Sequence, residues 1–375
     1  MSQGKIGAGQ ALLLLLLCRM VSLLAAAPLS DRGEIGGGMA VVALGVSFFA
    51  ELLLFWPGWL LMRRHPGQDL AQALSEEFGR FGRGAAFLLW LVLTVQAGLT
   101  AAEFEGFLRT AVYADAPETV FGVLFLLAAV FGVYAGLEAV ARFTTFGGAL
   151  FLLLAVSLFG SLLPQARVSE LYAAPMPAFP VFLGTVWSFV SGGLETVCFF
   201  LLLPRVRNAQ KTAGTGLYLL WKGLYLLFAA ALLLLTTCVL GGSGEQGRLY
   251  PFYTLAMAAE GTVLARLDAV HMSVWSVLGL LRCCLMLWGA NTALRCALPV
   301  PMEDGILHFA SEHRGAVTAV GALVTLWLLR FAAVYRVVRL LWREGIVLLI
   351  VLWVLPRSAL TVRFVRRKWG RRKTG

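Results

Sequence analysis

The residues best suited to ligand chemistry in this sequence interrupt an apolar run. The stretch 180–203 is long enough to cross a bilayer, yet its centre holds Ser191, two adjacent glycines and Glu195. Glycine weakens a helix, and a carboxylate at that depth costs about 3 kcal/mol or more on insertion scales. Irregular backbone inside a membrane is tolerated where it is buried in protein or lines a cavity. The pattern therefore predicts a discontinuous helix whose free N–H groups face an anionic ligand group.

A second irregularity lies in the first apolar run, where Arg19 and Ser22 stand among leucines. A zwitterionic ligand needs backbone donors for its carboxylate and exposed carbonyls for its ammonium group. The sequence alternatively fits a glycine-mediated close contact between two helices, with Glu195 paired to a cation. We favour the binding interpretation and expect a small mid-membrane cavity lined by Val21, Ser22, Ser191, Gly192, Gly193 and Leu194.

Ionisable residues within the apolar runs are equally divided between the two signs. Such residues are rare in membrane helices and usually pair or face a cavity, so the balance predicts mutual neutralisation. Two pairs at i, i+4 spacing, Glu105 with Arg109 and Glu138 with Arg142, are predicted to be structural ion pairs. The basic members within the runs are Arg19, Lys222, Arg282 and Arg330, and the acidic members are Glu51, Glu103, Glu105 and Glu195.

Motifs of enzymes are missing from the sequence. It contains no His-Glu-x-x-His, Gly-x-Ser-x-Gly, Walker-type glycine loop or Cys-x-x-Cys pair. The six cysteines lie in or beside apolar runs, which is typical of small buried hydrophobes, and none has metal-ligand spacing with a histidine. We therefore expect no enzymatic activity, no cofactor and no metal site.

The elements that must position these residues are membrane helices. The chain of 375 residues is 59% hydrophobic and 14% charged, whereas a soluble domain carries about 25% charged residues. Apolar runs recur almost to the end, which predicts one polytopic membrane domain over 1–375. The net charge of +11 does not indicate a nucleic-acid partner, because much of it lies in or beside the basic tail 363–375. Such a tail is typical of the cytoplasmic side and contacts anionic lipid.

Ten spans are predicted from the apolar runs and the polar breaks between them. The segment after the second span holds an amphipathic helix with Leu70, Ala73, Leu74 and Phe78 on one face, which we expect to lie along the membrane surface. The expected spans lie near 11–28, 37–62, 84–112, 118–136, 143–163, 180–203, 214–240, 267–295, 315–335 and 345–362.

An even number of spans places both termini on one side of the membrane. With the tail in the cytoplasm, nineteen Lys and Arg lie on that side and eight on the other, which agrees with the positive-inside rule.

Two halves of five spans, about 11–163 and 180–362, must have opposite orientations because five is odd. Inverted repeats place a binding site between corresponding discontinuous helices. Span one is therefore expected to be broken at 18–22, as span six is at 191–193.

Several short stretches follow one another in a characteristic order along the chain. They are Glu103-Phe104-Glu105, Gly136-Leu137-Glu138 up to Arg142, the span-six break followed by Leu203-Pro204, and Tyr250-Pro251, Leu255-Ala256 and Ala265-Arg266-Leu267-Asp268-Ala269 with Trp275. In this order they resemble the spore germination permease family, the B subunits of endospore germinant receptors, in the amino acid–polyamine–organocation superfamily. The resemblance covers about residues 10–360. Two departures are Val21-Ser22, where the family commonly has a Gly-Ser-type pair, and Leu194 between Gly193 and Glu195.

This resemblance implies an all-α integral membrane protein with a leucine-transporter-like 5+5 inverted repeat and broken helices 1 and 6. It also implies a subunit of the inner spore membrane that senses a small-molecule germinant, often an amino acid, and assembles with the family's A and C subunits. The alternatives are an amino acid permease that translocates its substrate and a purely structural membrane subunit.

Arg282 gains a specific hypothesis from the resemblance, because helix eight of this fold packs against helix one near a cation site. A guanidinium there stands in for a sodium ion and contacts carbonyls near Ser22. The simpler interpretation is a salt bridge from Arg282 to Glu195 or another carboxylate. In either case the arginine must have a partner.

Overall fold

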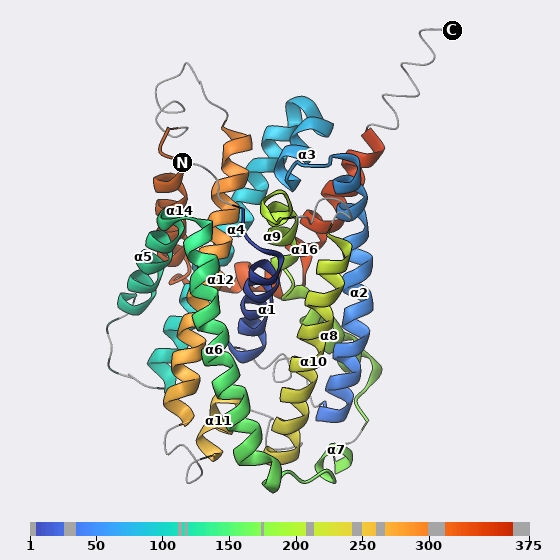
Figure 1. The fold of residues 1–375 in the computed structure, drawn as a ribbon, viewed down its shortest axis with the longest axis vertical. Helices are drawn as coiled ribbons and strands as arrows, with labels where there is room; N and C mark the ends of the chain where they lie inside the picture. Colours follow the sequence, from blue (N-terminus) through green and yellow to red (C-terminus); the bar gives the residue numbers. More distant parts are fainter. Residues whose placement is uncertain are drawn as a thin grey trace.

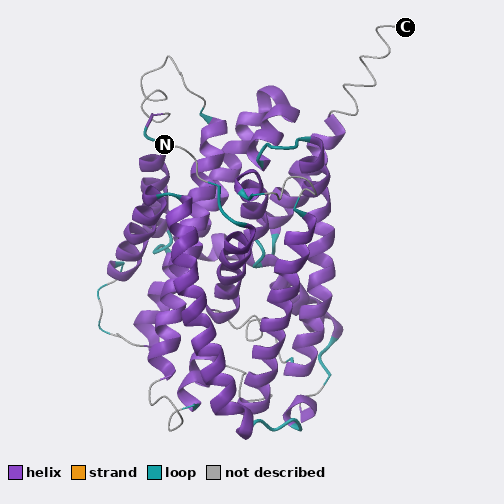
Figure 2. Cartoon of the chain, viewed as in Figure 1, coloured by secondary structure: helices purple, strands orange, loops and turns teal. Residues whose placement is uncertain are grey.

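The computed structural model describes residues 5–25, 35–111, 115, 117, 119–173, 176–207, 214–241, 250–259, 267–298 and 312–362. Within these ranges the chain is a bundle of helices joined by turns (Figures 1 and 2). The one β-type contact in them is an isolated bridge between Ile6 and Val206. Two predicted features lie outside the described residues: the basic tail 363–375, and Ala265-Arg266 at the start of the stretch that resembles the family.

The helices follow the predicted order of apolar runs. In the first half they are α1 Ala8–Ala25, α2 Gly37–Arg64, α3 Leu70–Phe78, α4 Gly82–Ala111, α5 Val120–Ala135, α6 Leu137–Leu162 and α7 Glu170–Ala173. In the second half they are α8 Phe179–Ser191, α9 Glu195–Leu202, α10 Thr215–Leu240, α11 Pro251–Ala258, α12 Leu267–Ala297, α14 Arg314–Leu328, α15 Ala332–Arg343 and α16 Ile346–Leu349, which continues through a π-turn to residue 362.

Six of these segments are long and apolar enough to cross a membrane, counting 179–205 as one span. Three of the other predicted spans correspond to shorter apolar helices of 10–17 residues, at 8–24, 120–135 and 346–362. The all-helical membrane architecture is thus confirmed, whereas the count of ten complete crossings is confirmed only in part.

The predicted ninth span, 315–335, is not one straight helix. It ends at Leu328, and the chain turns through 112° into α15. The cause lies in the sequence of α15, where Arg336, Arg339 and Arg343 follow helical spacing and cannot all face lipid. The bend turns this helix across the bundle instead of extending the crossing.

Helix α12 forms the centre of the bundle. It packs most extensively against α4, and it also contacts α1, α5, α6, α9 and α14. Its buried residues point in every direction around the helix, as expected for a helix enclosed by others. Five of the six cysteines are buried in this core and Cys296 is half-buried, in agreement with their predicted role as small hydrophobes.

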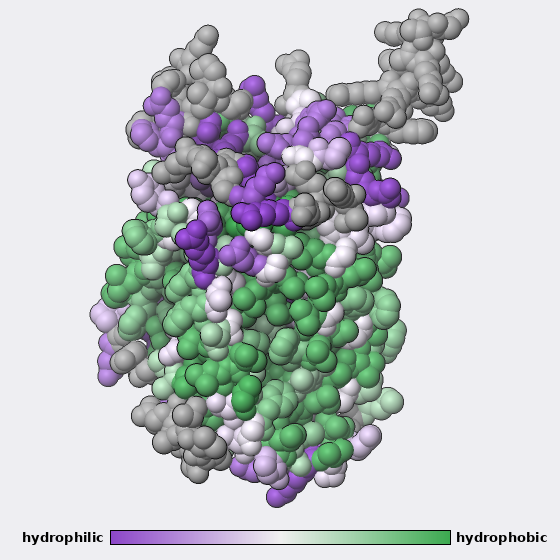
Figure 3. Space-filling model, viewed as in Figure 1, coloured by the Kyte–Doolittle hydropathy of each residue, from purple (hydrophilic) through white to green (hydrophobic). Residues whose placement is uncertain are grey.

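The outer surface has the polarity of a membrane protein. An apolar belt covers most of the face seen in Figure 3, and hydrophilic residues gather at the end that carries α3. The described end of the chain, the last turn before residue 363, lies at that same end (Figure 1). Helix α3 itself is amphipathic as predicted, with Leu70, Ala73 and Leu74 buried and a capping box between Asp69 and Gln72.

Asp69 makes the stability of this end dependent on pH. Burial raises the pKa of its carboxyl to about 6, although the Gln72 and Ala71 N–H groups oppose the shift. The folded protein then binds a proton that the unfolded chain releases near pH 4, so the free energy of unfolding falls as pH rises from about 4 to 6. We expect a loss of about 3 kcal/mol over this interval. Asp69→Asn retains a capping side chain and should flatten the dependence in thermal unfolding of the detergent-solubilised protein. Equal slopes for the two proteins would contradict the assignment.

Candidate functional site

The predicted interruption of span six is present. Helix α8 ends at Ser191, and α9 begins at Glu195 after three turn residues. Gly193 N–H donates to the Val190 carbonyl at 2.9 Å, and Thr196 N–H donates to Gly193 at 3.0 Å. These i→i+3 bonds replace the regular helical pattern, so the break is a tight turn rather than an extended unwound segment. The expectation of free N–H groups at the break is therefore not met at these two positions.

The adjacent glycines of this turn have a steric cause. A Cβ atom on Gly192 would lie 2.9 Å from Arg19 Nη1 and 3.5 Å from Ser22 Cβ, which belong to α1. A Cβ atom on Gly193 would lie 2.9 Å from the Val190 carbonyl oxygen and 3.5 Å from a carboxylate oxygen of Glu51. Glycine thus allows α1 and α2 side chains to reach the turn itself.

The corresponding break predicted in span one is wrong. Helix α1 runs without interruption from Ala8 to Ala25 through the whole of 18–22. Arg19 and Ser22 lie one turn apart on its surface and face the α8–α9 turn, where Ser22 Oγ is 3.5 Å from the Gly192 carbonyl oxygen. Helix α1 need not unwind, because the charge of Arg19 is satisfied by groups on neighbouring helices.

Five buried ionisable side chains from five helices meet beside the turn. Arg19 Nη2 lies 2.7 Å from Glu51 Oε1, and Lys222 Nζ contacts the other oxygen of the same carboxylate. Arg282 Nε lies 2.7 Å from Glu195 Oε1, and Arg19 Nη1 is 3.8 Å from Glu195 Oε2. All five side chains are at most 7% exposed. We name this set, Arg19, Glu51, Glu195, Lys222 and Arg282, the central charge cluster.

The cluster confirms that these five predicted residues pair with one another, with two carboxylates shared among three cations. Glu195 also lies at the first residue of α9, where the helix dipole favours a negative charge. The exposed Glu138–Arg142 pair is confirmed at 2.7 Å. Glu105 accepts a hydrogen bond from the backbone N–H of Thr119 before α5, a contact that the sequence did not indicate.

Arg282 follows the simpler of its two interpretations. Its predicted partner Glu195 is present, and the carbonyls near Ser22 belong to the continuous helix α1. A guanidinium contact with a backbone carbonyl does occur nearby, but Arg19 makes it: its Nη2 donates to the Phe189 carbonyl near the end of α8. At the α8–α9 turn, α1 thus supplies the guanidinium that contacts a backbone carbonyl, and α12 supplies the one that pairs with Glu195.

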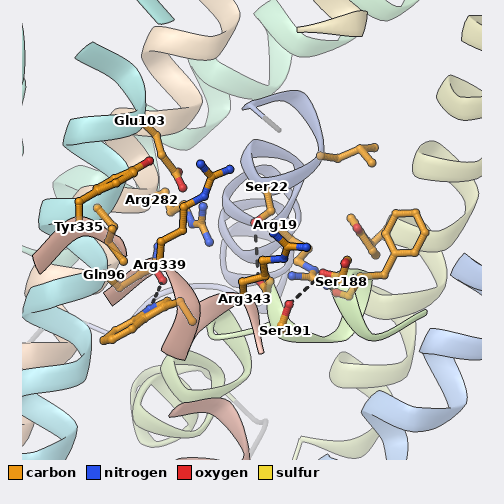
Figure 4. Close-up of a pocket in the computed structure, with 16 residues that line it drawn as sticks. Arg19, Ser22, Gln96, Glu103, Ser188, Ser191, Arg282, Tyr335, Arg339 and Arg343 are labelled. Carbon is orange, nitrogen blue, oxygen red and sulfur yellow. Dashed lines mark hydrogen bonds between the residues drawn. The ribbon is translucent and has the colours of Figure 1, made fainter. Parts of the chain in front are cut away.

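A cavity of about 180 Å³ opens beside the turn (Figure 4). Typical drug-sized pockets have about 300–1,000 Å³, so this one suits a small ligand. Of the six predicted ligand-binding residues, Ser22, Ser191 and Gly192 line it, whereas Val21, Gly193 and Leu194 are buried away from it. The remaining lining consists of Arg19, Leu23, Gln96, Leu99, Glu103, Ser188, Phe189, Tyr225, Arg282, Tyr335, Arg339, Trp342 and Arg343.

Helix α15 supplies one wall of the cavity that sequence reasoning missed. Trp342 Nε1 donates to Gln96 Oε1 at 2.8 Å, and Trp187 Nε1 donates to the Glu344 carbonyl at 2.8 Å. Arg339 extends from this helix toward Glu103 on α4 (Figure 4). The signal in the sequence was the i, i+3, i+7 spacing of Arg336, Arg339 and Arg343, which places them on one face of a helix.

Comparisons with known proteins agree with this geometry. A sequence profile described as spore germination protein matches residues 22–303. No curated protein matches the chain. Among solved structures, the chain is similar to Mhp1, a nucleobase-cation-symport-1 family transporter in a closed conformation with bromovinylhydantoin bound. The TM-score is 0.64 at 16% identity, over 87% of this chain and 73% of the other. MhsT in complex with L-phenylalanine matches with a TM-score of 0.40 at 13% identity, over 93% and 98%. The similarity to Mhp1 shows a transporter fold.

Proposed function

Because the chain belongs to the spore germination protein family, we propose that it is the germinant-sensing membrane subunit of a spore germination receptor. It binds a small molecule, an amino acid by our proposal, in the cavity beside the α8–α9 turn and thereby triggers germination. The observation that carries the proposal is this cavity itself, lined by α1, α4, α8, α10, α12 and α15 and bordered by the central charge cluster. Proteins with a transporter fold bind their ligands in polar spaces of this kind, near the middle of the membrane and beside discontinuous helices.

The remaining parts of the proposal follow from the family. The protein resides in the inner spore membrane with both termini in the cytoplasm, and it assembles with the A and C subunits of the receptor. The basic residues favour this orientation, because the loop after α9 and the start of α1, joined by the Ile6–Val206 bridge, both carry them.

The second candidate function is an amino acid permease. The transporter fold favours it, since the structurally similar Mhp1 is a transporter. Uptake of radiolabelled amino acids into proteoliposomes separates the two. For a sensor we expect binding without accumulation above that of empty liposomes, whereas steady accumulation identifies a permease.

Deletion and complementation test the sensing role in the spore. Spores without this gene should lose germination in response to one or more amino acids, and the wild-type gene should restore it. Normal germination of the deletion strain in response to every amino acid that the parent strain senses would contradict the proposal.

A further inference from the structure

A second cavity lies between α5, α12 and α14, on the side of the bundle. Its volume is about 450 Å³, and it shares no lining residue with the cavity beside the α8–α9 turn. Tyr134 in its wall is 76% exposed and Ala316 is also exposed, so the cavity opens to the outer surface of the protein. We name it the lateral groove. It is lined by Val130, Val133, Tyr134, Leu287, Asn291, Arg295, His313, Gly315, Ala316, Thr318 and Ala319.

The lateral groove is space that the described side chains leave unfilled. Gly315, Ala316 and Ala319 are small residues on the wall that α14 contributes, and a Cβ atom on Gly315 would meet nothing within 4 Å. The opposite wall, from α5, carries the larger Val130 and Val133. Small residues explain the room in the groove, whereas the chemistry of its floor indicates what fits there.

Helix α12 forms this floor with a stripe of graded polarity. Leu287, Asn291 and Arg295 follow one another at intervals of four residues, so they share one face and span about 12 Å along the helix. Leu287 is buried, Asn291 is half-buried and Arg295 is exposed. The floor thus changes from apolar to amide to guanidinium. A phospholipid has the same order of groups, with acyl chains, ester carbonyls and then the phosphate.

The charged end of the groove lies toward the polar end of the molecule. The first turn of α14 is directed toward the end that carries α3 (Figure 1), and hydrophilic residues gather at that end above the apolar belt (Figure 3). Arg295 is in the last turn of α12, which approaches α14 at the same end. The guanidinium therefore lies where the phosphate groups of one leaflet begin, and Leu287 lies on the side of the acyl chains.

This end of the groove has an excess of positive charge. Arg314 lies one turn beyond Arg295, because its Nε and Nη2 donate to the Leu298 carbonyl at 3.2 and 2.7 Å. The charge of Arg295 also acts on Arg205, and Asp69 is the described carboxyl that counters these two arginines. Three guanidinium groups and one carboxyl attract an anionic head group and disfavour a head group that carries its own cation.

We propose that the lateral groove binds one anionic phospholipid, with its phosphate at Arg295 and an acyl chain along Leu287 and Val130. The inference does not depend on the germinant site, since the two cavities are lined by different residues. The bound lipid fills the space between α5 and α14 and holds both helices against α12. A zwitterionic phospholipid with the same chains fits the apolar part equally well but brings a further cation to the three arginines, so it binds more weakly.

The test compares head groups on the purified, delipidated full chain in detergent. The probes are palmitoyl-oleoyl phosphatidylglycerol, phosphatidylcholine with the same chains, and glycerol phosphate, which has the phosphate without chains. The unfolding midpoint is measured at rising probe concentration, and native mass spectrometry counts the retained lipid. We expect phosphatidylglycerol to produce the same shift as phosphatidylcholine at about fivefold or more lower concentration, because this is the contribution of one arginine at an anionic membrane surface. Glycerol phosphate should produce no shift.

Variants locate the lipid in the groove. Arg295→Gln should abolish the preference for phosphatidylglycerol, and Ala316→Trp should reduce the retention of both lipids because the indole fills the groove. Arg142→Gln, in the exposed pair with Glu138, is the control for the loss of an arginine. Ala128→Trp, at an exposed position of α5 outside the groove lining, is the control for the added indole. Both controls should behave as wild type. If Arg295→Gln does not fold, the comparison of lipids on the wild-type chain and Ala316→Trp still decide the proposal.

The possible results separate the parts of the proposal. Equal shifts by phosphatidylglycerol and phosphatidylcholine on the wild-type chain overturn the anionic class of the lipid. A shift by glycerol phosphate as large as that by phosphatidylglycerol also overturns the proposal, because the site would then bind phosphate without chains. A preference for phosphatidylglycerol that persists in Arg295→Gln contradicts the position of the head group. Equal lipid retention by Ala316→Trp and Ala128→Trp places the lipid outside the lateral groove.

Discussion

Spores that carry Gly192→Leu as their only copy of this protein lose the germination response while the protein remains at its normal amount. The new side chain starts 2.9 Å from Arg19 Nη1 and fills the cavity between α1 and the α8–α9 turn. Arg19 cannot move aside freely, because Glu51 and the Phe189 carbonyl hold it. Overpacking of this kind costs about 1–3 kcal/mol, which a stable membrane bundle can tolerate, whereas ligand access is lost completely. Germination is measured by the fall in optical density, and protein amount by immunoblot of spore membranes.

Gly223→Leu is the matched control for this substitution. Gly223 lies in the middle of α10 on an exposed surface, and a Cβ atom there meets nothing within 4 Å. The same change of volume away from the cavity should therefore leave the response unchanged. A normal response of the Gly192→Leu spores to all germinants would exclude the α8–α9 turn as the ligand site.

The break in span six could be predicted because several local costs coincide there. Two glycines weaken the helix, and Glu195 needs a cavity or a partner, so both features favour an irregular segment here. The tightness of the turn could not be predicted. It depends on how closely Arg19 of α1 and Glu51 of α2 approach, and these residues are distant in the sequence.

The errors in span one and span nine have a related cause. Arg19 and Ser22 appeared to break α1, but the partners that permit a regular helix come from α2 and α8. The arginines of α15 were assigned to a loop, although a bend of 112° brings Arg339 and Arg343 to the cavity. A single sequence reveals that a buried charge needs a partner, while the identity of the partner depends on packing.

A second large effect is expected from Glu195→Gln, which removes charge with little change of shape. Arg282 then loses the carboxylate at 2.7 Å, and Arg19 loses the one at 3.8 Å. Removal of one partner from a buried pair costs about 3–5 kcal/mol, since the remaining charge stays buried without compensation. We expect a lower unfolding midpoint in detergent and less protein in the membrane. Glu138→Gln in the exposed pair with Arg142 is the control, and a change within about 0.5 kcal/mol is expected.

The double substitution Glu195→Gln with Arg282→Met distinguishes a salt bridge from a sodium-like role for Arg282. Arg282→Met alone leaves Glu195 with only the more distant Arg19, so it is also destabilising. If the two side chains pair with one another, the double variant loses less free energy of unfolding than the two single variants lose in sum. The difference measures the interaction between the two side chains. Sodium should not change the midpoint of any of these variants, because a salt bridge leaves no vacant cation site. Additive effects would show that the two residues act independently, and stabilisation of Arg282→Met by sodium but not by choline would restore the sodium-like interpretation.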